Sequence, residues 1–597
     1  MTKVSSFSEP ALNGTRSISG KIWRKRLTDE RLALALSQKC SLPDLVSRVL
    51  VGRGVDIESV NTFLTPSLRK QIPDPSQFLD MDQAVARIIK AIKLEEGIGV
   101  FGDYDVDGAT SAALLMRFFC SLDRNVHVHI PDRRKEGYGP NLPAILRLKE
   151  KGVTLIITVD CGTTAFSVLE EAKMAGIDII VIDHHAAENR LPAGAIVVNP
   201  NRMDENRNYG QLAAVGVTFM LVIAINRALR NLSWYGTEQP EPDLLQWLDL
   251  VALGTICDVV PLIGINRALV KQGLRVLAAR SNPGINALAE VACVDRMLNA
   301  YHAGFILGPR INAGGRVGKA DLGVKLLSSN NQSEVFAIAE ILNSLNKERQ
   351  QIEQEVYIAA LDQAKQQMLN KDPLIFVAAE GWHVGVIGIV AGRLRETFDV
   401  PACVVAIGDG IGIGSARSVT GIGLGSAVIA AQQLGLLLSG GGHSMAAGFT
   451  VGKGHLLQLH TFLKENVNRQ LNGIQIKSEL LIDGVVSISG AVIELVDLLE
   501  QVGPFGAGNS RPRFLVPDVF IVDSSIVGNN HVRCVLSDKS GKQRLKGIAF
   551  RKVDTEVGDA LLNHHGLALH VAGTLRTDNW QGRNSVQMFI EDICFQA

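Results

Sequence analysis

Short apolar segments alternate with helical stretches between Gly97 and Ile182, and this alternation constrains the fold most strongly. Each apolar segment has the length and the branched side chains of a buried strand. Strands that alternate with helices of this length form βαβ units, which build a parallel sheet. The predicted strands are Ile98–Phe101, Val126–Ile130, Val153–Val159 and Ile177–Ile182, and the predicted helices are Ala109–Phe119, Asn141–Glu150 and Phe166–Ala175.

Acidic residues follow three of the predicted strands directly. Asp103 follows the first strand, Asp160 the third and Asp183 the fourth. In open parallel sheets the ligand crevice lies outside the carboxyl ends of the strands. We therefore expect these carboxylates to meet in space although they lie far apart in the sequence.

The densest acidic motif is DYDVDG, in which Asp103, Asp105 and Asp107 occupy alternate positions. We place it in a loop, Gly102–Gly108, because glycines punctuate both of its ends. Carboxylates this close repel one another and normally need a cation to neutralise them. The motif alone fits a solvated acidic turn equally well, but it is no EF-hand, because the twelfth loop position is Leu114.

Further candidate ligands follow downstream. His184 and His185 come directly after Asp183, and Asp258 ends the apolar segment LDLVALGTICDVVPL. Four carboxylates with one histidine make an oxygen-rich site, which suits Mn²⁺ or Mg²⁺ better than Zn²⁺. Two ions that share one carboxylate are common in phosphoryl chemistry. This set consists of Asp103, Asp105, Asp160, Asp258 and one of the two histidines.

DYDVDG, VDCG, DHH and CDVVPL occur in the order and context of the DHH phosphoesterases, which this chain resembles. The later motifs resemble those of the RecJ single-strand-specific DNA exonucleases, and the likeness extends from about Gly97 to the C-terminus. One position departs from relatives such as the manganese pyrophosphatases, which place a histidine where this chain has Gly99. The later motifs are GPRINAGGR (308–316), GWHVGVIGIVAGRL (381–394), GSARS (414–418), GGGHSMAAGF (440–449), GPFGAGNSRPRF (503–514) and the terminal NWQGRNSVQMFIEDI.

The resemblance implies an α/β protein built from several domains, as 597 residues also suggest. A parallel-sheet DHH domain and a smaller α/β DHHA1 domain are joined by a long helix, and a β-barrel of the OB-fold type follows. Apolar residues at helical spacing independently predict the joining helix over Ser333–Gln367, which would otherwise be a surface helix of a single lobe. The predicted boundaries are an N-terminal extension at 1–90, DHH at 91–332, the helix at 333–367, DHHA1 at 368–470 and the barrel at 471–597.

The resemblance also assigns roles at the metal site. It implies two Mn²⁺ or Mg²⁺ ions, with Asp160 as the bridge between them. A divalent ion lowers the pKa of water that it binds, as phosphodiester hydrolysis requires. His185 is the predicted contact to the phosphate or the leaving oxygen, and Asp107 supports the acidic loop without binding metal; we group both as catalytic. The implied ligands are Asp103, Asp105, Asp160, His184 and Asp258.

Substrate-binding residues are expected in the glycine-rich motifs, where backbone amides can approach phosphates. Asn312 and Arg316, in a predicted NAGGR loop, would hold a phosphate next to the scissile one. Arg133, Ser415 and Arg417 are candidates for gripping the 5′ end. The full predicted set is Arg133, Arg310, Asn312, Gly315, Arg316, His383, Ser415, Arg417, Gly442 and His443, with barrel contacts at Arg511, Arg513, Phe514, Arg533 and Trp580.

Composition restricts the cellular setting. Lys+Arg and Asp+Glu are balanced at 60 each, which favours a local basic groove over a basic coat. The eight cysteines form no CxxC pair, so we expect a reducing compartment and no zinc knuckle. Residues 1–20 lack an apolar core, and no apolar segment reaches membrane-spanning length, so we expect a cytoplasmic protein with neither a secretory signal nor a membrane anchor.

Together these features predict a metal-dependent 5′→3′ exonuclease that degrades single-stranded DNA to mononucleotides in DNA repair and recombination. The resemblance implies a monomer that works with single-strand-binding protein and repair helicases. A phosphodiesterase for nanoRNA or cyclic dinucleotides is the alternative, although its small substrates do not need a C-terminal barrel. A non-enzymatic DNA-binding scaffold is a further alternative, although it would not need the full ligand set.

Overall fold

The computed structural model describes residues 11–12, 15–132, 136–206, 208–472, 478–563, 566–578 and 584–596. The chain divides into two compact units. The central unit consists of Pro75–Cys257 and Val276–Ile476, and the terminal unit of Met1–Asp74, Asp258–Arg275 and Lys477–Ala597. The terminal unit is thus assembled from both ends of the chain and one short internal segment.

The first lobe of the central unit contains the predicted parallel sheet, in the order β3-β2-β4-β5-β6 with all neighbours parallel. All four predicted strands are confirmed, within one or two residues at their ends. A fifth strand, β6, was not predicted. The strands are β2 (Gly97–Gly102), β3 (Val126–His129), β4 (Val153–Val159), β5 (Asp178–Ile182) and β6 (Ala195–Val198).

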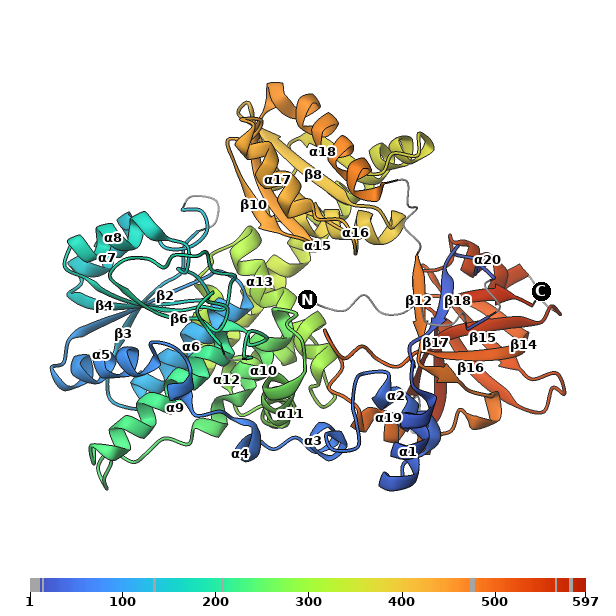
Figure 1. Cartoon of the computed structure of the whole chain (residues 1–597), viewed down its shortest axis with the longest axis horizontal. Coiled ribbons are helices and arrows are strands. Elements are labelled where there is room, and N and C mark those ends of the chain that lie inside the picture. Colours follow the sequence, from blue (N-terminus) through green and yellow to red (C-terminus); the bar gives the residue numbers. More distant parts are fainter. Residues whose placement is uncertain are drawn as a thin grey trace. The chain divides into compact units, whose positions relative to one another are not determined.

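Helices cover both faces of this sheet (Figure 1). One face packs against α7 (Leu142–Glu150) and α8 (Phe166–Met174), through a core that includes Phe101 and Ile156. The other face carries α5, α6 and α9. Burial on both sides explains why the inner strands β4 and β5 are almost continuously apolar rather than alternating. These last helices are α5 (Met81–Lys93), α6 (Val106–Cys120) and α9 (Ala214–Asn231).

The predicted loop Gly102–Gly108 is shorter in the structure, because α6 already begins at Val106. Asp105 is its N-cap and accepts hydrogen bonds from the backbone N–H groups of Asp107 (2.9 Å) and Gly108 (3.1 Å). Gly108 permits a close approach, since a Cβ there would lie 2.4 Å from the carbonyl oxygen of Asp103. The second glycine therefore marks tight packing inside the first helical turn and not the end of a loop.

Helix α9 is the one described helix that is long and apolar enough to cross a membrane. It has 18 residues and a mean hydropathy of 1.2, but 72% of this stretch is buried inside the protein. Its N-terminal part packs against α6 and its polar residues lie near its C-terminal end. Helix α9 is thus a core helix of the central unit.

The predicted connecting helix is confirmed as α15 (Gln332–Leu369). Its first part packs on helices of the first lobe. Its later part packs on the second lobe through Val356, Ala360 and Ala364. The helix therefore joins the two lobes of the central unit. The first-lobe helices are η2 (Leu244–Trp247), α10 (Leu248–Cys257), α12 (Pro283–Val291), the π-helix η3 (His302–Leu307), α13 (Gly308–Val317) and α14 (Leu322–Ser328), and α11 spans Gly264–Ala279.

The second lobe is a five-stranded mixed sheet in the order β10-β11-β9-β8-β7. Successive residues of β8 enter opposite cores: Val404 packs with α15 and α16, whereas Cys403 and Val405 pack with α17 and α18. The strands are β7 (Ile375–Glu380), β8 (Ala402–Gly408), β9 (Ile411–Arg417), β10 (Ser439–His443) and β11 (Ala446–Gly452), and the helices α16 (Ile387–Phe398), α17 (Leu424–Gln433), η4 (Lys453–His455) and α18 (Leu456–Leu471).

The terminal unit contains the predicted barrel. Strands β14, β15, β16, β18 and β17 pair in that order, and β17 pairs back onto β14, which closes five strands into a ring. This is the architecture expected of an OB-fold. The elements are β13 (Gly484–Val485), η5 (Ile488–Gly490), α19 (Ile493–Gln501), β14 (Phe514–Val527), β15 (His531–Ser537), β16 (Arg544–Ala549), α20 (Glu556–Asn563), β17 (Leu569–Asp578) and β18 (Ser585–Phe595).

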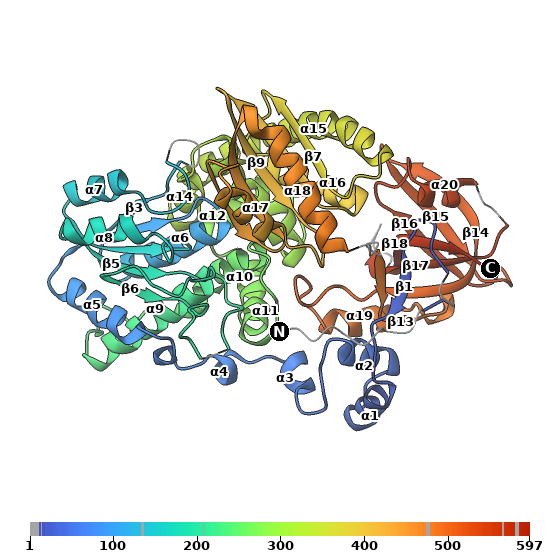
Figure 2. The same ribbon diagram turned by 45° about the horizontal axis from the view of Figure 1, so that its top comes forward.

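The N-terminal segment, in which the sequence revealed no motif, packs onto this barrel. Strand β1 (Ile22–Lys25) pairs parallel with β12 (Glu479–Ile482). Helices α1 (Glu30–Cys40) and α2 (Asp44–Val51) contribute Leu36, Val49 and Leu50 to one core with the barrel strands. Figure 2 shows α1, α2 and α19 gathered at one end of the barrel. The short elements α3 (Val60–Leu64), α4 (Leu68–Gln71) and η1 (Pro75–Gln77) follow.

A buried carboxylate ties the N-terminal segment to the barrel. The Asp483 side chain is fully buried and forms ion pairs with Arg26 (3.0 Å) and Arg53 (2.8 Å). It also accepts a hydrogen bond from the backbone N–H of Arg513 at 2.9 Å. Arg53 reaches further, to the Asn509 side chain and the Ser510 carbonyl. One anion thus holds two guanidinium groups from the other end of the chain.

Asp483→Ala should destabilise the terminal unit by about 3–5 kcal/mol, because it leaves two buried or half-buried cations without their anion. Urea denaturation followed by tryptophan fluorescence measures this loss. The control is Asp44→Ala, which removes an exposed ion pair with Arg48 and should cost no more than about 1 kcal/mol. Equal effects of the two substitutions would contradict a special role for Asp483.

Candidate metal centre

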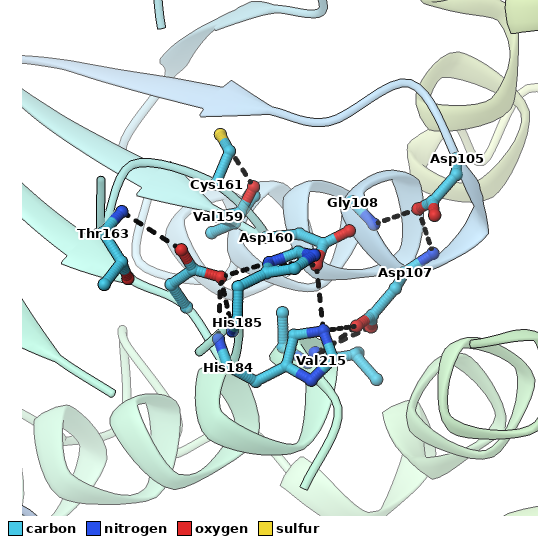
Figure 3. Close-up of polar contacts among 12 residues, drawn as sticks. Asp105, Asp107, Gly108, Val159, Asp160, Cys161, Thr163, His184, His185 and Val215 are labelled. Carbon is cyan, nitrogen blue, oxygen red and sulfur yellow. Dashed lines mark hydrogen bonds and ion pairs between the residues drawn. The ribbon is translucent and has the colours of Figure 1, made fainter. Parts of the chain in front are cut away.

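Three acids that follow neighbouring strands lie at one edge of the first-lobe sheet, as predicted. Asp103, Asp160 and Asp183, after β2, β4 and β5, are each at most 4% exposed. Ligand atoms of Asp103, Asp105 and Asp160 lie within 4.8 Å of one another, and so do those of Asp160, His184 and His185. Asp160 belongs to both groups and lies at their centre (Figure 3).

Asp160 adopts a left-handed backbone conformation, with φ of 61°. Aspartate tolerates this region better than most residues, and such conformations concentrate at functional sites. Its backbone N–H donates to the Ile182 carbonyl (3.0 Å), which continues the pairing of β4 with β5 for one residue. The Tyr138 hydroxyl donates to the Asp160 carbonyl at 3.2 Å. The backbone of Asp160 is therefore fixed from two sides.

Asp183 positions the histidines and is not among the predicted ligands. Its Oδ1 accepts hydrogen bonds from the backbone N–H of His184 (2.7 Å) and from Nδ1 of His185 (2.8 Å), and its Oδ2 accepts one from the Thr163 N–H (3.1 Å). Burial alone would raise the pKa of Asp183, but the hydrogen bond and charge of His185 hold it well below its usual value. Asp183 is thus an anion that orients the His185 ring.

His184 has the environment of a neutral ligand. Its Nε2 lies 3.4 Å from an Asp160 oxygen and 3.8 Å from an Asp107 oxygen. Burial, and then the neighbouring His185, lower the pKa of His184 to about 4. A neutral imidazole offers a lone pair to a metal ion, which a protonated ring does not.

Asp107 supports the acidic motif through α9. Its two carboxylate oxygens accept hydrogen bonds from the backbone N–H groups of Ala214 (2.7 Å) and Val215 (2.9 Å), at the start of that helix. The carboxylate therefore caps a helix that has no side-chain cap of its own. Burial, and then the charge of Asp105, raise the pKa of Asp107 to about 7. Its predicted role as a support that does not bind metal stays a prediction.

Three residues of this centre were missed by the sequence analysis. Tyr138 contacts Asp160 as described, and its hydroxyl lies 3.4 Å from Nε2 of His185. The Asn199 and Asn201 side chains donate to the carbonyl oxygens of His185 (2.9 Å) and His184 (2.5 Å). The two asparagines follow β6, so the end of the unpredicted strand was the signal that would have located them.

Asp258 and Arg133 are two further predicted site residues. Asp258 comes directly after Cys257, the last residue of α10, and that helix packs along α6. Arg133 lies outside the described residues. Their predicted roles in metal binding and 5′-end binding stay predictions.

The predicted NAGGR loop is helical, which corrects the sequence analysis. Asn312, Gly315 and Arg316 belong to α13. The glycines allow neighbouring elements to pack closely: a Cβ at Gly315 would lie 2.9 Å from the Tyr104 carbonyl, within the acidic motif. Arg310, on the same helix, donates to the Asn343 side chain (3.0 Å) and to the Ile306 carbonyl (2.7 Å).

The first lobe reaches the second through Arg316, whose Nη1 donates to the Gly385 carbonyl at 2.9 Å. The Gly385 N–H in turn donates to Nδ1 of His383 at 3.0 Å. Arg316 and His383, predicted from separate motifs, therefore both contact the backbone of Gly385. Gly385 lies two residues before the start of α16.

Four further predicted residues lie on the second-lobe sheet. Ser415 and Arg417 lie on β9, and Arg417 Nη1 lies 3.4 Å from the Ser415 hydroxyl. Gly442 and His443 lie at the end of β10. In the strand register His443 is opposite Ala446, which is opposite Arg417. His443 and Arg417 thus share one end of the sheet, two strands apart.

Comparisons with known proteins agree with this architecture. Residues 97–255 match the DHH family N-terminal domain, residues 371–471 the DHHA1 domain and residues 482–592 the RecJ OB domain. The chain is 35% identical over 581 residues to the single-stranded-DNA-specific exonuclease RecJ of Escherichia coli, which covers 96% of this chain and 98% of that protein. It belongs to the RecJ family.

A second RecJ exonuclease, that of Bacillus subtilis, is 33% identical over 96% of this chain and 70% of its own length. The solved structure of Thermus thermophilus RecJ in complex with Mn²⁺ covers 96% of this chain and 79% of that one, with a TM-score of 0.79 at 28% identity. The same protein has been solved with Mg²⁺, with a TM-score of 0.74 at 26% identity. The predicted fold is thereby confirmed.

The donor set of this RecJ-family chain fits such an ion. Carboxylate oxygens predominate, one imidazole has a low pKa, and no cysteine contributes to the groups found in the described residues. Hard oxygen donors favour Mn²⁺ or Mg²⁺. All eight cysteines are free.

The predicted barrel contacts need correction. Phe514 is 1% exposed and belongs to the barrel core, so it is not available to DNA. Arg511 pairs with Glu500, and Arg513 pairs with Glu591 at 2.7 Å. Arg533 is exposed, and Trp580 lies outside the described residues. Phe514 is thus the contact that the structure contradicts, and the roles predicted for Arg511, Arg513 and Arg533 stay predictions.

Asp160→Asn should remove most of the thermal stabilisation that Mn²⁺ gives, because both ligand groups lose their shared anion. A ligand that binds only the folded state stabilises it in proportion to the logarithm of its concentration over Kd, so weaker binding gives a smaller shift in Tm. Without metal the variant should melt at or slightly above the melting temperature of the unaltered chain, since one repelling charge is gone.

Glu170→Gln, an exposed position on α8, is the control and should keep the full shift in Tm. An undiminished shift for Asp160→Asn would contradict the central position of Asp160.

Proposed function

We propose that the chain is a Mn²⁺- or Mg²⁺-dependent exonuclease that degrades single-stranded DNA stepwise from the 5′ end to mononucleotides. The observation that carries this proposal is the Asp160 carboxylate, which lies within ligand distance of two donor groups in a chain of the RecJ family. Two ions that share a carboxylate are a common arrangement for phosphodiester hydrolysis.

The residues that would hold the ions are Asp103, Asp105, Asp160, His184 and Asp258. When bound, the ions supply charge neutralisation at the scissile phosphate and lower the pKa of the attacking water. Asp105 uses one oxygen to cap α6, which fixes its carboxylate before any metal arrives. Asp107 holds α6 against α9 and thereby keeps the acidic motif in place.

His185 is the proposed proton-handling group. Its Nδ1 faces Asp183, so the Nδ1–H donates to that carboxylate and Nε2 remains to face the substrate. An imidazole oriented by a buried anion can hold a proton at Nε2 and deliver it to the leaving oxygen. The Tyr138 hydroxyl, 3.4 Å from Nε2, fixes the ring from its other side.

The remaining predicted residues would grip the strand. Asn312, Gly315 and Arg316 bind the phosphate next to the scissile one, with Arg310 and His383 beside them. Ser415, Arg417, Gly442 and His443 bind the 5′-terminal phosphate, and Arg133 assists. The sheet register supports this grouping, because His443 and Arg417 share one end of the second-lobe sheet.

The cellular setting is proposed from the family alone. The chain acts in DNA repair and recombination in the cytoplasm, as a monomer, on strands that repair helicases open and single-strand-binding protein covers. Light scattering of the purified protein tests the monomer, and a complex of twice the chain mass would contradict it.

A 5′-tailed duplex should lose its tail in the presence of Mn²⁺, whereas a blunt duplex should resist and EDTA should stop all cleavage. DNA labelled at the 3′ end reveals the direction as a descending ladder of products. Affinity should fall as salt rises, because phosphate contacts release counterions, but with a modest slope for a chain of zero net charge. Equal cleavage of blunt and tailed substrates would refute the single-strand proposal, and activity restricted to dinucleotides would favour the small-substrate phosphodiesterase.

Arg417→Ala should abolish the preference for a 5′-phosphate over a 5′-hydroxyl end. A charge-assisted hydrogen bond contributes about 1.5–3 kcal/mol, so kcat/KM on phosphorylated strands should fall roughly 10- to 150-fold and that on hydroxyl ends much less. Arg395→Ala, on α16 and half-exposed, is the matched control and should leave both values unchanged. A uniform loss on both substrates would show that Arg417 supports the fold and does not bind the end.

A further inference from the structure

Two aromatic rings are stacked on the surface of the central unit. Tyr301 directly precedes η3 and Phe305 lies within it. Their ring centroids are 5.3 Å apart with an angle of 28° between the planes, and the residues are 54% and 71% exposed. Met297, nearby in the sequence, is 76% exposed. Soluble proteins rarely expose such a group of large apolar side chains without a binding partner.

The helical turn that carries the pair is a π-helix. Such turns are rare and occur frequently at functional sites. Its other side packs closely on α10: a Cβ at Gly304 would lie 3.3 Å from Ile256, and one at Gly308 only 2.4 Å from the Cys257 sulfur. The glycine-lined side is thus used for packing, while the aromatic residues remain exposed.

Two arginines lie near His302, the residue that follows Tyr301. Arg280 donates from Nη2 to the carbonyls of Val294 (2.6 Å) and Arg296 (2.9 Å), which holds its guanidinium at this segment. The His302 ring lies 5.8 Å from that of Tyr301. Burial, and then the charges of Arg280 and Arg296, lower the pKa of His302. Both arginines therefore lie near His302, whose ring contacts that of Tyr301.

The aromatic pair is also connected to the metal centre by one continuous helical path. η3 runs directly into α13, and Gly315 at the end of that path lies against Tyr104, between Asp103 and Asp105. Ten residues separate Phe305 from Gly315, which is roughly 15 Å of helix. A strand with stacked bases about 3.4 Å apart covers this distance in roughly four or five nucleotides.

We propose that Tyr301 and Phe305 form a stacking platform for bases of the single-stranded substrate, some four or five nucleotides from the scissile phosphate. The proposal rests on the proposed function and adds a retention site within the central unit. Flat, exposed rings with nearby guanidinium groups are the features by which proteins bind single strands without sequence preference. Strands too short to reach the platform should be bound and cleaved without it.

Binding is measured by fluorescence anisotropy in EDTA, so that catalysis plays no part, with labelled oligothymidylates of three and twenty nucleotides. Phe305→Ala should weaken binding of the longer strand roughly 5- to 150-fold, the range for one lost base stack, and leave the trinucleotide unchanged. Phe305→Leu should lose as much as Phe305→Ala, whereas Phe305→Trp should retain affinity. The matched control is Phe336→Ala, which removes a 43% exposed aromatic side chain from α15 and should change neither value.

Mn²⁺-dependent hydrolysis of the trinucleotide provides the second readout, and kcat should be the same in all variants. If Phe305→Ala binds the longer strand within twofold of the unaltered chain, the platform does not exist. If Phe305→Leu binds as well as the unaltered chain, the patch is merely apolar, which overturns base stacking in favour of protein docking. If the unaltered chain fails to hydrolyse DNA while Phe305→Ala still loses affinity, the proposed function is wrong and the platform stands.

Discussion

Repulsion between carboxylates at the end of a parallel sheet is the constraint on which the central unit depends. Asp103, Asp160 and Asp183 must converge because neighbouring parallel strands end at the same edge. The protein offsets this repulsion with fixed dipoles. Asp183 accepts four N–H groups around the DHH motif, Asp107 caps α9, and Asp105 caps α6. Donor atoms from the acidic motif and from the DHH histidines surround Asp160, and this is where we propose that a divalent cation binds.

The acids of the centre thus fall into two classes that look alike in the sequence. Asp183 and Asp107 direct both oxygens at backbone N–H groups or His185, so they shape the site. Asp160 lies within 4.8 Å of donor atoms of both histidines and of the acidic motif, so it is the carboxylate that we propose to bind metal. The stacking platform proposed on η3 belongs to the same unit, and α13 links it to the acidic motif.

The sequence predicted what depends on local pattern. Apolar runs located four strands of the sheet, helical spacing located α15, and strand-end acids located the metal site. It failed where glycine signified packing rather than a turn, as at Gly108 and in α13, because the neighbours that demand a small residue are distant in sequence. The sequence did not reveal the role of Asp183, because a carboxylate that orients a histidine has the same sequence signature as a metal ligand. Phe514 was predicted to contact DNA, but the closed barrel buries its side chain.

The shared core of the terminal unit has a consequence for biosynthesis. Helices α1 and α2 emerge from the ribosome early, but the barrel strands that cover Leu36, Val49 and Leu50 come roughly 450–550 residues later. At about 5–20 residues per second the N-terminal helices wait roughly 25–110 s for their partner. The central unit is complete before that moment and can fold first. Nascent chains therefore expose the apolar face of this N-terminal segment until the barrel strands have been synthesised.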